Sequence, residues 1–424
     1  MQITRDEFLN SIKTSNSSLF CIVGPNYSGK TYLLKNFFEN YITIGGLLID
    51  ETGKVRRKVA TDEIFISSDN NYYIYQDKKQ RGKDHTANGS KVALDEASKE
   101  IIKVVKKYKD RIINFLQNGK PESLGISKIM NIINILLSTN LNNISYVIID
   151  EPENSLDDNN LKIVIEFINT LILFKKKVVI VTHSPRLLEL MKVEVDNIYK
   201  VNDLMGKIQN LKFTDVEKIY IDCGSELKEV PGYKSLYISD IIQFNAGEIF
   251  RNLYINYVLK SQDFYRVLFY NDVVLMEGKT EEFIIRETKY SKKYSKNVYY
   301  MEGKYKAYFL IELFSNYCNQ VNCFMDRDKK SKLDDNNNFS YQMNDTFKRK
   351  YNNNLKVKIF YFNNNIEDEL GVDINEVMID FVGEENKNNK RCKKNLKPFI
   401  SLRYLQKHPE CIENLDSLTN EFNF

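Results

Sequence analysis

Short apolar runs recur along the whole chain, and polar residues follow each of them. The runs are rich in Val, Ile, Phe and Tyr, and they lack the alternating polar positions of a half-exposed strand. Such runs are typical of strands buried on both faces of a parallel sheet. The pattern predicts strands at residues 19–23, 146–149, 178–181, 273–276, 321–325 and 357–362.

A helical spacing appears between the first two of these runs. Apolar residues recur there at every third or fourth position: Ala97, Ile101, Val105, Tyr108, Ile112 and Phe115. This stripe predicts an amphipathic helix that ends near Asn118-Gly119, with Pro121 just beyond. Strands and helices alternate in both halves of the chain, so we predict an α/β architecture throughout.

The length of 424 residues exceeds a single ordinary core and favours two domains with connectors. We expect a first domain at residues 1–212 and a helical connector at 213–268, where no chemical motif occurs. A second domain is expected at 269–375, and a basic C-terminal segment at 376–424.

Composition narrows the class of protein. Hydrophobic content of 42% and charged content of 28% are typical of a soluble globular protein. No apolar run reaches the roughly 18 residues of a membrane span, and the N-terminus lacks a signal-peptide layout, so we expect a cytoplasmic protein. Six cysteines without a CxxC pair and only three histidines argue against disulfides, structural zinc and zinc catalysis.

The net charge of +4 does not by itself indicate nucleic-acid binding. A local cluster is more informative: Lys387, Lys390, Arg391, Lys393, Lys394 and Lys397. We interpret this cluster either as a solvated tail or as a patch that contacts phosphates, and the sequence favours neither.

A phosphate-binding loop follows the first predicted strand. Its residues are Gly24, Pro25, Asn26, Tyr27, Ser28, Gly29, Lys30 and Thr31, which match GxxxxGKT between a strand and a helix. Backbone N–H groups of such a loop surround phosphate oxygens, aided by the positive end of the next helix. We expect Lys30 to reach the β- and γ-phosphates of ATP and the Thr31 hydroxyl to bind Mg²⁺.

Three further residues fit the same nucleotide chemistry. Asp150 ends a predicted strand and is expected to hold Mg²⁺, while Glu151 can polarise the attacking water. His183 follows the strand at 178–181 and could sense the γ-phosphate. An ordinary strand-end histidine is the alternative.

A second acidic set lies in the other half of the chain. Glu277 and Glu281 follow the strand at 273–276, and Asp326 and Asp328 follow the strand at 321–325. Alternation along an extended chain places Asp326 and Asp328 on one side. Divalent Mg²⁺ or Mn²⁺ ions prefer oxygen ligands, and two ions can stabilise both oxygens of a phosphodiester displacement.

The first half resembles ABC-type ATPases. Ser123-Leu124-Gly125-Ile126-Ser127, Asp150-Glu151, Ser155-Leu156-Asp157 and His183 occur in the order of the signature, Walker B, D-loop and switch histidine of that family. Leu124 stands where the family signature has a second glycine. The resemblance implies that Ser123 and Gly125 complete the ATP site of another subunit, so that heads dimerise around ATP. It also makes Gln76 the candidate for the Q-loop.

The second half resembles a Toprim domain, and the whole chain resembles OLD-family (overcoming lysogenisation defect) nucleases, which fuse an ABC-type ATPase to a C-terminal Toprim (Rossmann-like) domain. The resemblance implies that Glu277, Glu281, Asp326 and Asp328 are metal ligands, with Glu367 as a further acidic position. It implies a Gly-Lys turn at Gly303-Lys304 and a C-terminal lysine, Lys397 or a neighbour.

These motifs predict an ATP-regulated, Mg²⁺- or Mn²⁺-dependent DNA endonuclease. In this reading Glu151, His183, Glu277, Asp326 and Asp328 are catalytic, and the resemblance implies a homo-oligomer and a role in defence against phage, in which another defence protein could take part. The alternatives are an ATPase sensor that binds DNA or a partner with a non-cleaving Toprim-like half, and nucleotidyl transfer of the primase kind.

Overall fold

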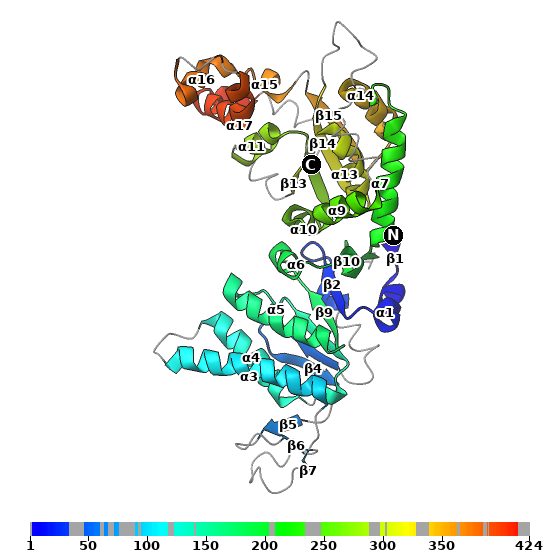
Figure 1. Cartoon of the computed structure of the whole chain (residues 1–424), viewed down its shortest axis with the longest axis vertical. Coiled ribbons are helices and arrows are strands. Elements are labelled where there is room, and N and C mark those ends of the chain that lie inside the picture. Colours follow the sequence, from blue (N-terminus) through cyan, green and yellow to red (C-terminus); the bar gives the residue numbers. More distant parts are fainter. Residues whose placement is uncertain are drawn as a thin grey trace. The chain divides into compact units, whose positions relative to one another are not determined.

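The computed structural model describes residues 2–33, 46–59, 63–66, 72–75, 90–91, 95–117, 123–139, 141–202, 208–233, 247–287, 297–301, 303–327, 339–362, 365–384, 388 and 390–413. The chain forms two compact units, Met1–Leu211 and Lys212–Phe424. Each unit contains a sheet rich in parallel strands together with helices (Figure 1). The predicted α/β architecture is therefore confirmed at this level.

Parallel strands form the centre of the sheet in the first unit. Its strands are β1 (Gln2–Ile3), β2 (Leu19–Val23), β3 (Gly46–Ile49), β4 (Val55–Val59), β8 (Tyr146–Asp150), β9 (Lys177–Val181), β10 (Ile198–Val201) and β11 (Ile208–Gln209). Their order is β1-β11-β10-β2-β9-β8-β3-β4, and β10, β2, β9, β8 and β3 are parallel to their neighbours in this series. A separate antiparallel sheet contains β5 (Glu63–Ile66), β6 (Tyr72–Tyr75) and β7 (Ser90–Lys91).

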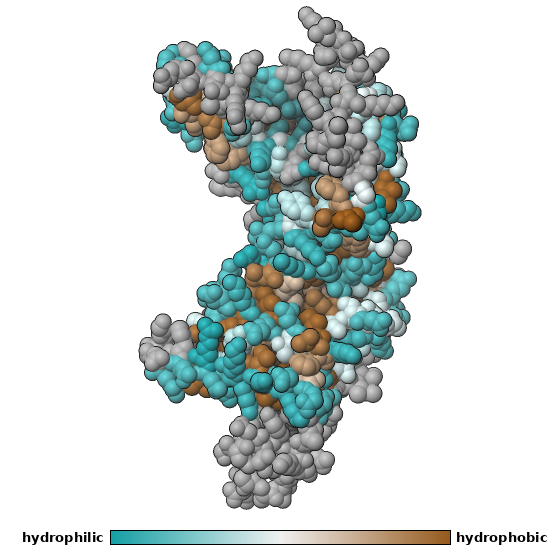
Figure 2. Space-filling model, viewed as in Figure 1, coloured by the Kyte–Doolittle hydropathy of each residue, from teal (hydrophilic) through white to brown (hydrophobic). Residues whose placement is uncertain are grey.

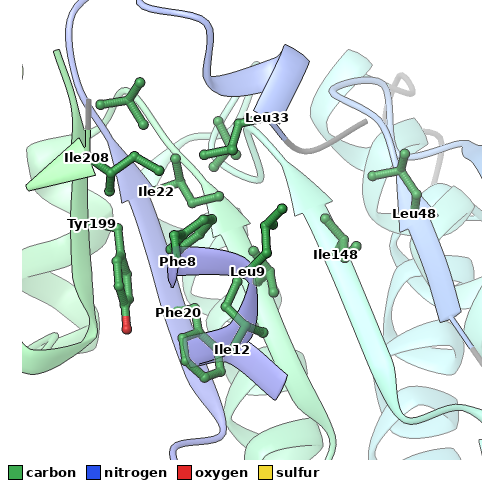
Figure 3. Close-up of a cluster of buried hydrophobic side chains, with 13 residues drawn as sticks. Phe8, Leu9, Ile12, Phe20, Ile22, Leu33, Leu48, Ile148, Tyr199 and Ile208 are labelled. Carbon is green, nitrogen blue, oxygen red and sulfur yellow. The ribbon is translucent and has the colours of Figure 1, made fainter. Parts of the chain in front are cut away.

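Helices bury this sheet. They are α1 (Arg5–Thr14), α3 (Glu96–Gln117), α4 (Leu124–Ser138), α5 (Asp158–Leu173) and α6 (Pro185–Met191), with 3₁₀ turns at Leu141–Asn143 and Val195–Asn197. Phe8 and Ile12 of α1 pack in one buried cluster with Phe20 and Ile22 of β2 (Figure 3). The alternate residue Cys21 is also buried, so β2 is covered on both faces, and this explains its unbroken apolar run. The helix predicted from the apolar stripe is α3, and it is confirmed.

The sheet of the second unit is fully parallel. Its strands are β12 (Asp272–Met276), β13 (Val298–Tyr300), β14 (Gln320–Asp326) and β15 (Val357–Phe362), in the order β13-β12-β14-β15. The connecting helices are α11 (Lys279–Glu287), α13 (Lys304–Ser315) and α14 (Phe339–Tyr351). After β13 the chain returns past β12 to form β14, so the direction of winding reverses between β12 and β14. Ligands of open α/β sheets bind at the carboxyl ends of strands at such a switch point.

The remaining helices of the second unit lie before and after this sheet. They are α7 (Phe213–Lys228), α9 (Glu248–Leu259), α10 (Gln262–Val267), α15 (Ile366–Glu369), α16 (Ile374–Val382) and α17 (Lys390–Lys407), and a 3₁₀ turn covers Pro409–Glu413. Tyr220 of α7 packs edge-on against Phe309 of α13, with ring centroids 5.2 Å apart. The described helices of the stretch expected as a connector thus belong to the second unit.

Apolar residues also remain at the surface of this unit. Ile249, Leu253 and Tyr257 of α9 are four residues apart and exposed, so they share one helical face. Figure 2 shows brown, hydrophobic atoms at the surface in the region where Figure 1 labels α9. No helix in the described residues has both the length and the apolar character needed to cross a bilayer.

Candidate functional site

The predicted phosphate-binding loop lies directly after β2. Gly24 has φ 144°, and a Cβ added there would lie 2.2 Å from the main-chain oxygen of Val201, so only glycine fits. Tyr27 and Gly29 also have positive φ, and the helix begins at Lys30. These backbone reversals give the loop the curled path that phosphate binding requires.

Lys30 is held inside the loop. Its Nζ donates hydrogen bonds to the main-chain oxygens of Gly24, at 3.0 Å, and Pro25, at 2.7 Å. Burial lowers the pKa of Lys30 to about 8, although Glu151 and Asp150 oppose this shift. The Ser28 side chain is buried, and in the described part of the chain its hydroxyl has no hydrogen-bond partner.

Asn26, Tyr27 and Thr31 of the loop are exposed, and Tyr27 has 94% of its surface accessible. Thr31, the expected Mg²⁺ ligand, is therefore open to solvent. The loop therefore exposes polar groups to solvent, while the Lys30 ammonium bonds main-chain oxygens of the same loop.

The ends of β8 and β9 bring the expected catalytic residues together. Asp150 is the buried last residue of β8, and the Glu151 N–H donates to the main-chain oxygen of Val181 at 2.8 Å. The His183 Nε2 lies 3.2 Å from the Glu151 Oε1. Burial, together with the charge of Lys30, lowers the pKa of His183, and Glu151 opposes this shift. Because β2, β9 and β8 are adjacent and parallel, their carboxyl ends place these groups at one edge.

The signature-like segment begins α4 and packs against the D-loop-like turn. The Ser123 hydroxyl caps α4 by accepting the Ile126 N–H at 3.2 Å. A Cβ added at Gly125 would lie 2.7 Å from the main-chain oxygen of Ser155, so this close approach requires glycine. Leu124 is 80% exposed. Gln76, the Q-loop candidate, lies outside the described residues.

Four carboxylates of the second unit occupy the carboxyl end of its sheet. Glu277 directly follows β12, Asp326 ends β14, Glu281 is in the first turn of α11, and Glu367 is in α15 beyond β15. The Glu277 Oε2 accepts the Asp326 N–H at 2.9 Å, which ties the two strand ends together. Glu281 and Glu367 are each only 3% exposed. The switch point between β12 and β14 thus lies among acidic side chains.

The charges of this acidic cluster interact strongly. Burial raises the pKa of Glu281 to about 8, and the charges of Asp326, Glu277 and Glu367 add to the shift. The Lys397 Nζ of α17 lies 2.9 Å from the Glu367 Oε2. Burial alone would lower the pKa of Lys397, but Glu367, Asp326 and Glu281 raise it. Of the lysines in the basic segment, the described contacts place Lys397 at the cluster, whereas Lys393 bonds Asn375 at 2.6 Å.

Gly303 and Lys304 lie at the same edge. Lys304 is 2% exposed, and its Nζ donates to the main-chain oxygen of Asp326 and lies 3.9 Å from the Glu277 Oε2. The Gly303 N–H donates to the main-chain oxygen of Glu277 at 3.2 Å. The turn at the start of α13 therefore supports both Glu277 and Asp326.

A complete ligand set for a metal ion does not form within the described ranges, where no group of three or more His, Cys, Asp or Glu side chains is arranged to hold one. Asp328, the fifth expected carboxylate, lies outside those ranges. The side chains present nevertheless suit a hard cation, because the buried Glu367 and the half-buried Glu277 and Asp326 lie near enough to Glu281 to add to the effect of burial in raising its pKa. In the described residues the Glu367 Oε1 is buried without a hydrogen-bond partner.

Two residues near the predicted phosphate-binding loop, the buried Lys128 and the half-buried Glu153, were missed by sequence reasoning. The Lys128 Nζ of α4 donates to the main-chain oxygens of Glu151, at 2.7 Å, and Asn154, at 3.2 Å. Glu153 accepts hydrogen bonds from the turn that carries His183. Neither residue belongs to a motif, and their hydrogen-bond partners lie far away in the sequence, so no sequence pattern indicates them.

The sequence was also compared with known families and curated proteins. No family model matches it, and no curated protein matches it.

Proposed function

We propose that the protein is an ABC-type ATPase joined to a Toprim-type, divalent-metal-dependent endonuclease that cuts DNA, as in OLD-family nucleases. In this proposal ATP acts at the first unit and cleavage occurs at the second. The observation that carries it is the acidic cluster of Glu277, Glu281, Asp326 and Glu367 at the switch point of a parallel sheet.

The geometry of the first unit supports the ATPase half. Three features lie at one edge of three adjacent strands: a glycine-requiring loop after β2, the buried Asp150 at the end of β8, and the contact of Glu151 after β8 with His183 after β9. Asp150 and Thr31 would hold Mg²⁺, and Lys30 would exchange its backbone acceptors for phosphate oxygens. Glu151 would orient the attacking water and accept its proton. The exposed Ser123 and Leu124 suit a surface that meets a second copy.

The second unit supports a metal-dependent reaction on a phosphodiester. Glu277, Glu281, Asp326 and Glu367 would hold Mg²⁺ or Mn²⁺, with Asp328 as a further candidate. A bound divalent ion lowers the pKa of water and offsets charge on the phosphate. Lys304 fixes the backbone at Asp326, and Lys397 supplies a cation that can offset charge on the scissile phosphate.

The DNA contact is proposed to involve α17. This helix carries Lys397 into the acidic cluster, and the same helix includes Lys390, Arg391, Lys393 and Lys394. Cations along one helix can follow a phosphate backbone. A role in defence against phage, with or without a further defence protein, follows only from the resemblance to the OLD family.

The proposal is tested with purified protein, supercoiled plasmid and Mg²⁺ or Mn²⁺, with and without ATP. Wild type is compared with Lys30→Ala, Glu277→Ala, Asp326→Ala and Glu281→Gln. Glu282→Gln is the matched control, because Glu282 is the adjacent acid of α11 and pairs with Arg286 at 2.6 Å.

We expect the three acidic-cluster variants to lose cleavage by about 10²-fold or more, as removal of catalytic charge does, and Glu282→Gln to keep it. Retained cleavage in both Glu277→Ala and Asp326→Ala would rule out the nuclease. If wild type hydrolyses ATP and binds DNA without cutting it, the non-cleaving sensor is the better description. If Lys30→Ala leaves ATP turnover and its effect on cutting intact, ATP regulation through this loop is wrong.

A further inference from the structure

Glu153 is a half-buried residue with a buried carboxylate oxygen, and the proposed hydrolysis does not itself use it. It lies in the turn after β8, two residues beyond Glu151. Its Oε1 accepts two hydrogen bonds from the turn after β9, one from the His183 N–H and one from the Thr182 hydroxyl, each at 2.8 Å. One oxygen atom thus joins the two turns.

The turn that Glu153 holds is the one that presents His183. The Thr182 hydroxyl accepts the Ser184 N–H at 2.9 Å, and the Ser184 hydroxyl caps α6 by accepting the Leu187 N–H at 3.1 Å. The path of the chain from β9 into α6 is therefore set by a short series of hydrogen bonds that ends on Glu153. The His183 imidazole emerges from this turn and reaches Glu151 at 3.2 Å.

We propose that Glu153 is a positioning residue: it fixes the backbone of His183 so that the imidazole meets Glu151, and it contacts no nucleotide. The expected effect of Glu153 on the rate of ATP hydrolysis rests on the proposed ATPase activity. The geometric part, the hold of Glu153 on His183, can be measured without ATP.

The two oxygens of Glu153 predict how substitutions behave. Oε1 makes both bonds, whereas Oε2 is buried without a hydrogen-bond partner in the described residues. Burial also raises the pKa of this carboxyl. Both bonds need only an acceptor oxygen at the Oε1 position, which a glutamine side chain also supplies, so Glu153→Gln should function. Glu153→Met has a similar shape but leaves the two donors without their acceptor.

The first measurement is hydrogen exchange. The chain has only three histidines, so ¹⁵N-histidine labelling gives three main-chain amide signals, and His183→Gln identifies the one that belongs to His183. We expect slow exchange at His183 in wild type and Glu153→Gln, and exchange about tenfold faster in Glu153→Met, as loss of one hydrogen bond predicts. Equal exchange in all three proteins would overturn the hold of Glu153 on His183.

The second measurement is a double-mutant cycle on ATP turnover with His183→Ala. We expect Glu153→Met to lower kcat by about tenfold or more with little change in KM, and to have no further effect once His183 is alanine. Additive effects, or a Glu153→Gln variant as slow as Glu153→Met, would overturn the positioning role. Thr182→Val, which removes one donor and keeps the side-chain shape, should fall between wild type and Glu153→Met.

These two measurements separate the failure of the inference from the failure of the proposed function. A wild-type protein without ATP turnover refutes the ATPase, and the exchange rate of the His183 amide still decides whether Glu153 holds the turn. Thermal unfolding of each variant shows whether a slow protein is still folded.

Discussion

Replacing Gly278 by alanine should disable the acidic cluster without removing a carboxylate. Gly278 lies between β12 and α11, and a Cβ added there would be 2.4 Å from the Glu281 Oε2 and 3.2 Å from its Cδ. Ordinary contacts between heavy atoms are about 3.5 Å, so the Glu281 carboxylate must retreat by about 1 Å. The backbone of Gly278 does not have a positive φ, so alanine itself fits the chain there.

The retreat displaces the carboxylate of Glu281, which is enclosed in the acidic cluster. Its side chain is 3% exposed, and burial together with Asp326, Glu277 and Glu367 raises its pKa to about 8. Misplacing a reacting or ligating group by about 1 Å can cost about 10²-fold in rate. We therefore expect Gly278→Ala to lower metal-dependent plasmid cleavage by about 10²-fold and to leave ATP turnover unchanged. The free energy of unfolding should change by less than about 1 kcal/mol, as for glycine replacements that the backbone accepts.

The assay is the rate of plasmid nicking over a range of Mg²⁺ or Mn²⁺ concentrations, with urea denaturation of the same samples. Gly247→Ala is the matched control, because Gly247 also precedes a helix, α9, and a Cβ there meets no atom within 4 Å. Wild-type cleavage by Gly278→Ala, combined with lost cleavage in Glu281→Gln, would refute the reasoning, since the carboxylate would then be free to move. A large loss of stability in Gly278→Ala alone would refute it as well.

Three further predictions concern lysine and histidine side chains. Lys128→Met leaves two buried main-chain oxygens without their donor, so urea denaturation should show a loss of about 2 kcal/mol or more, and Lys128→Arg a smaller one. Lys397→Met should weaken cleavage yet tighten Mn²⁺ binding in calorimetry, because a competing cation is gone, whereas Lys393→Met should bind Mn²⁺ as wild type does. His408 has a raised pKa because it bonds Glu376 and lies near a second carboxylate. The protonated His408 stabilises the fold fully below the pKa of an unfolded histidine, near 6.5, and this stabilisation is lost as pH rises through the pKa of His408 in the folded protein. The melting temperatures of wild type and His408→Gln should therefore converge at alkaline pH.

Much of the fold could be predicted because each buried strand is continuous in sequence. All six predicted strands are present, and β15 begins and ends at the predicted residues. The apolar residues that predicted α3 also lie within one continuous segment of the sequence. The strand order in each sheet could not be read in this way, because it depends on which crossover the chain takes. The position of β12 beside both β13 and β14, which creates the switch point, is visible only in the structure.

Part of the candidate site could likewise be predicted from local sequence, and part could not. Residues such as Lys30, Asp150 and Glu277 directly follow a predicted strand or begin a helix, so their neighbourhood was predictable. Glu153 and Lys128 act across long separations in sequence, through hydrogen bonds to main-chain atoms of other turns. Main-chain partners leave no trace in residue type, and no pattern could have indicated these two residues.

The pKa of a lysine shifts in opposite directions at the two sites, and this difference bears on how each site would accept its ligand. At the nucleotide loop burial dominates, so the pKa of Lys30 falls to about 8, and its partners are neutral main-chain oxygens that phosphate can replace. At the acidic cluster the carboxylates dominate, so the pKa of Lys397 rises, and its partner is the charged Glu367. A pair of opposite charges adds a Coulomb attraction that a neutral main-chain oxygen does not supply. An anion therefore meets little competition at Lys30, whereas a cation that binds Glu367 must compete with Lys397.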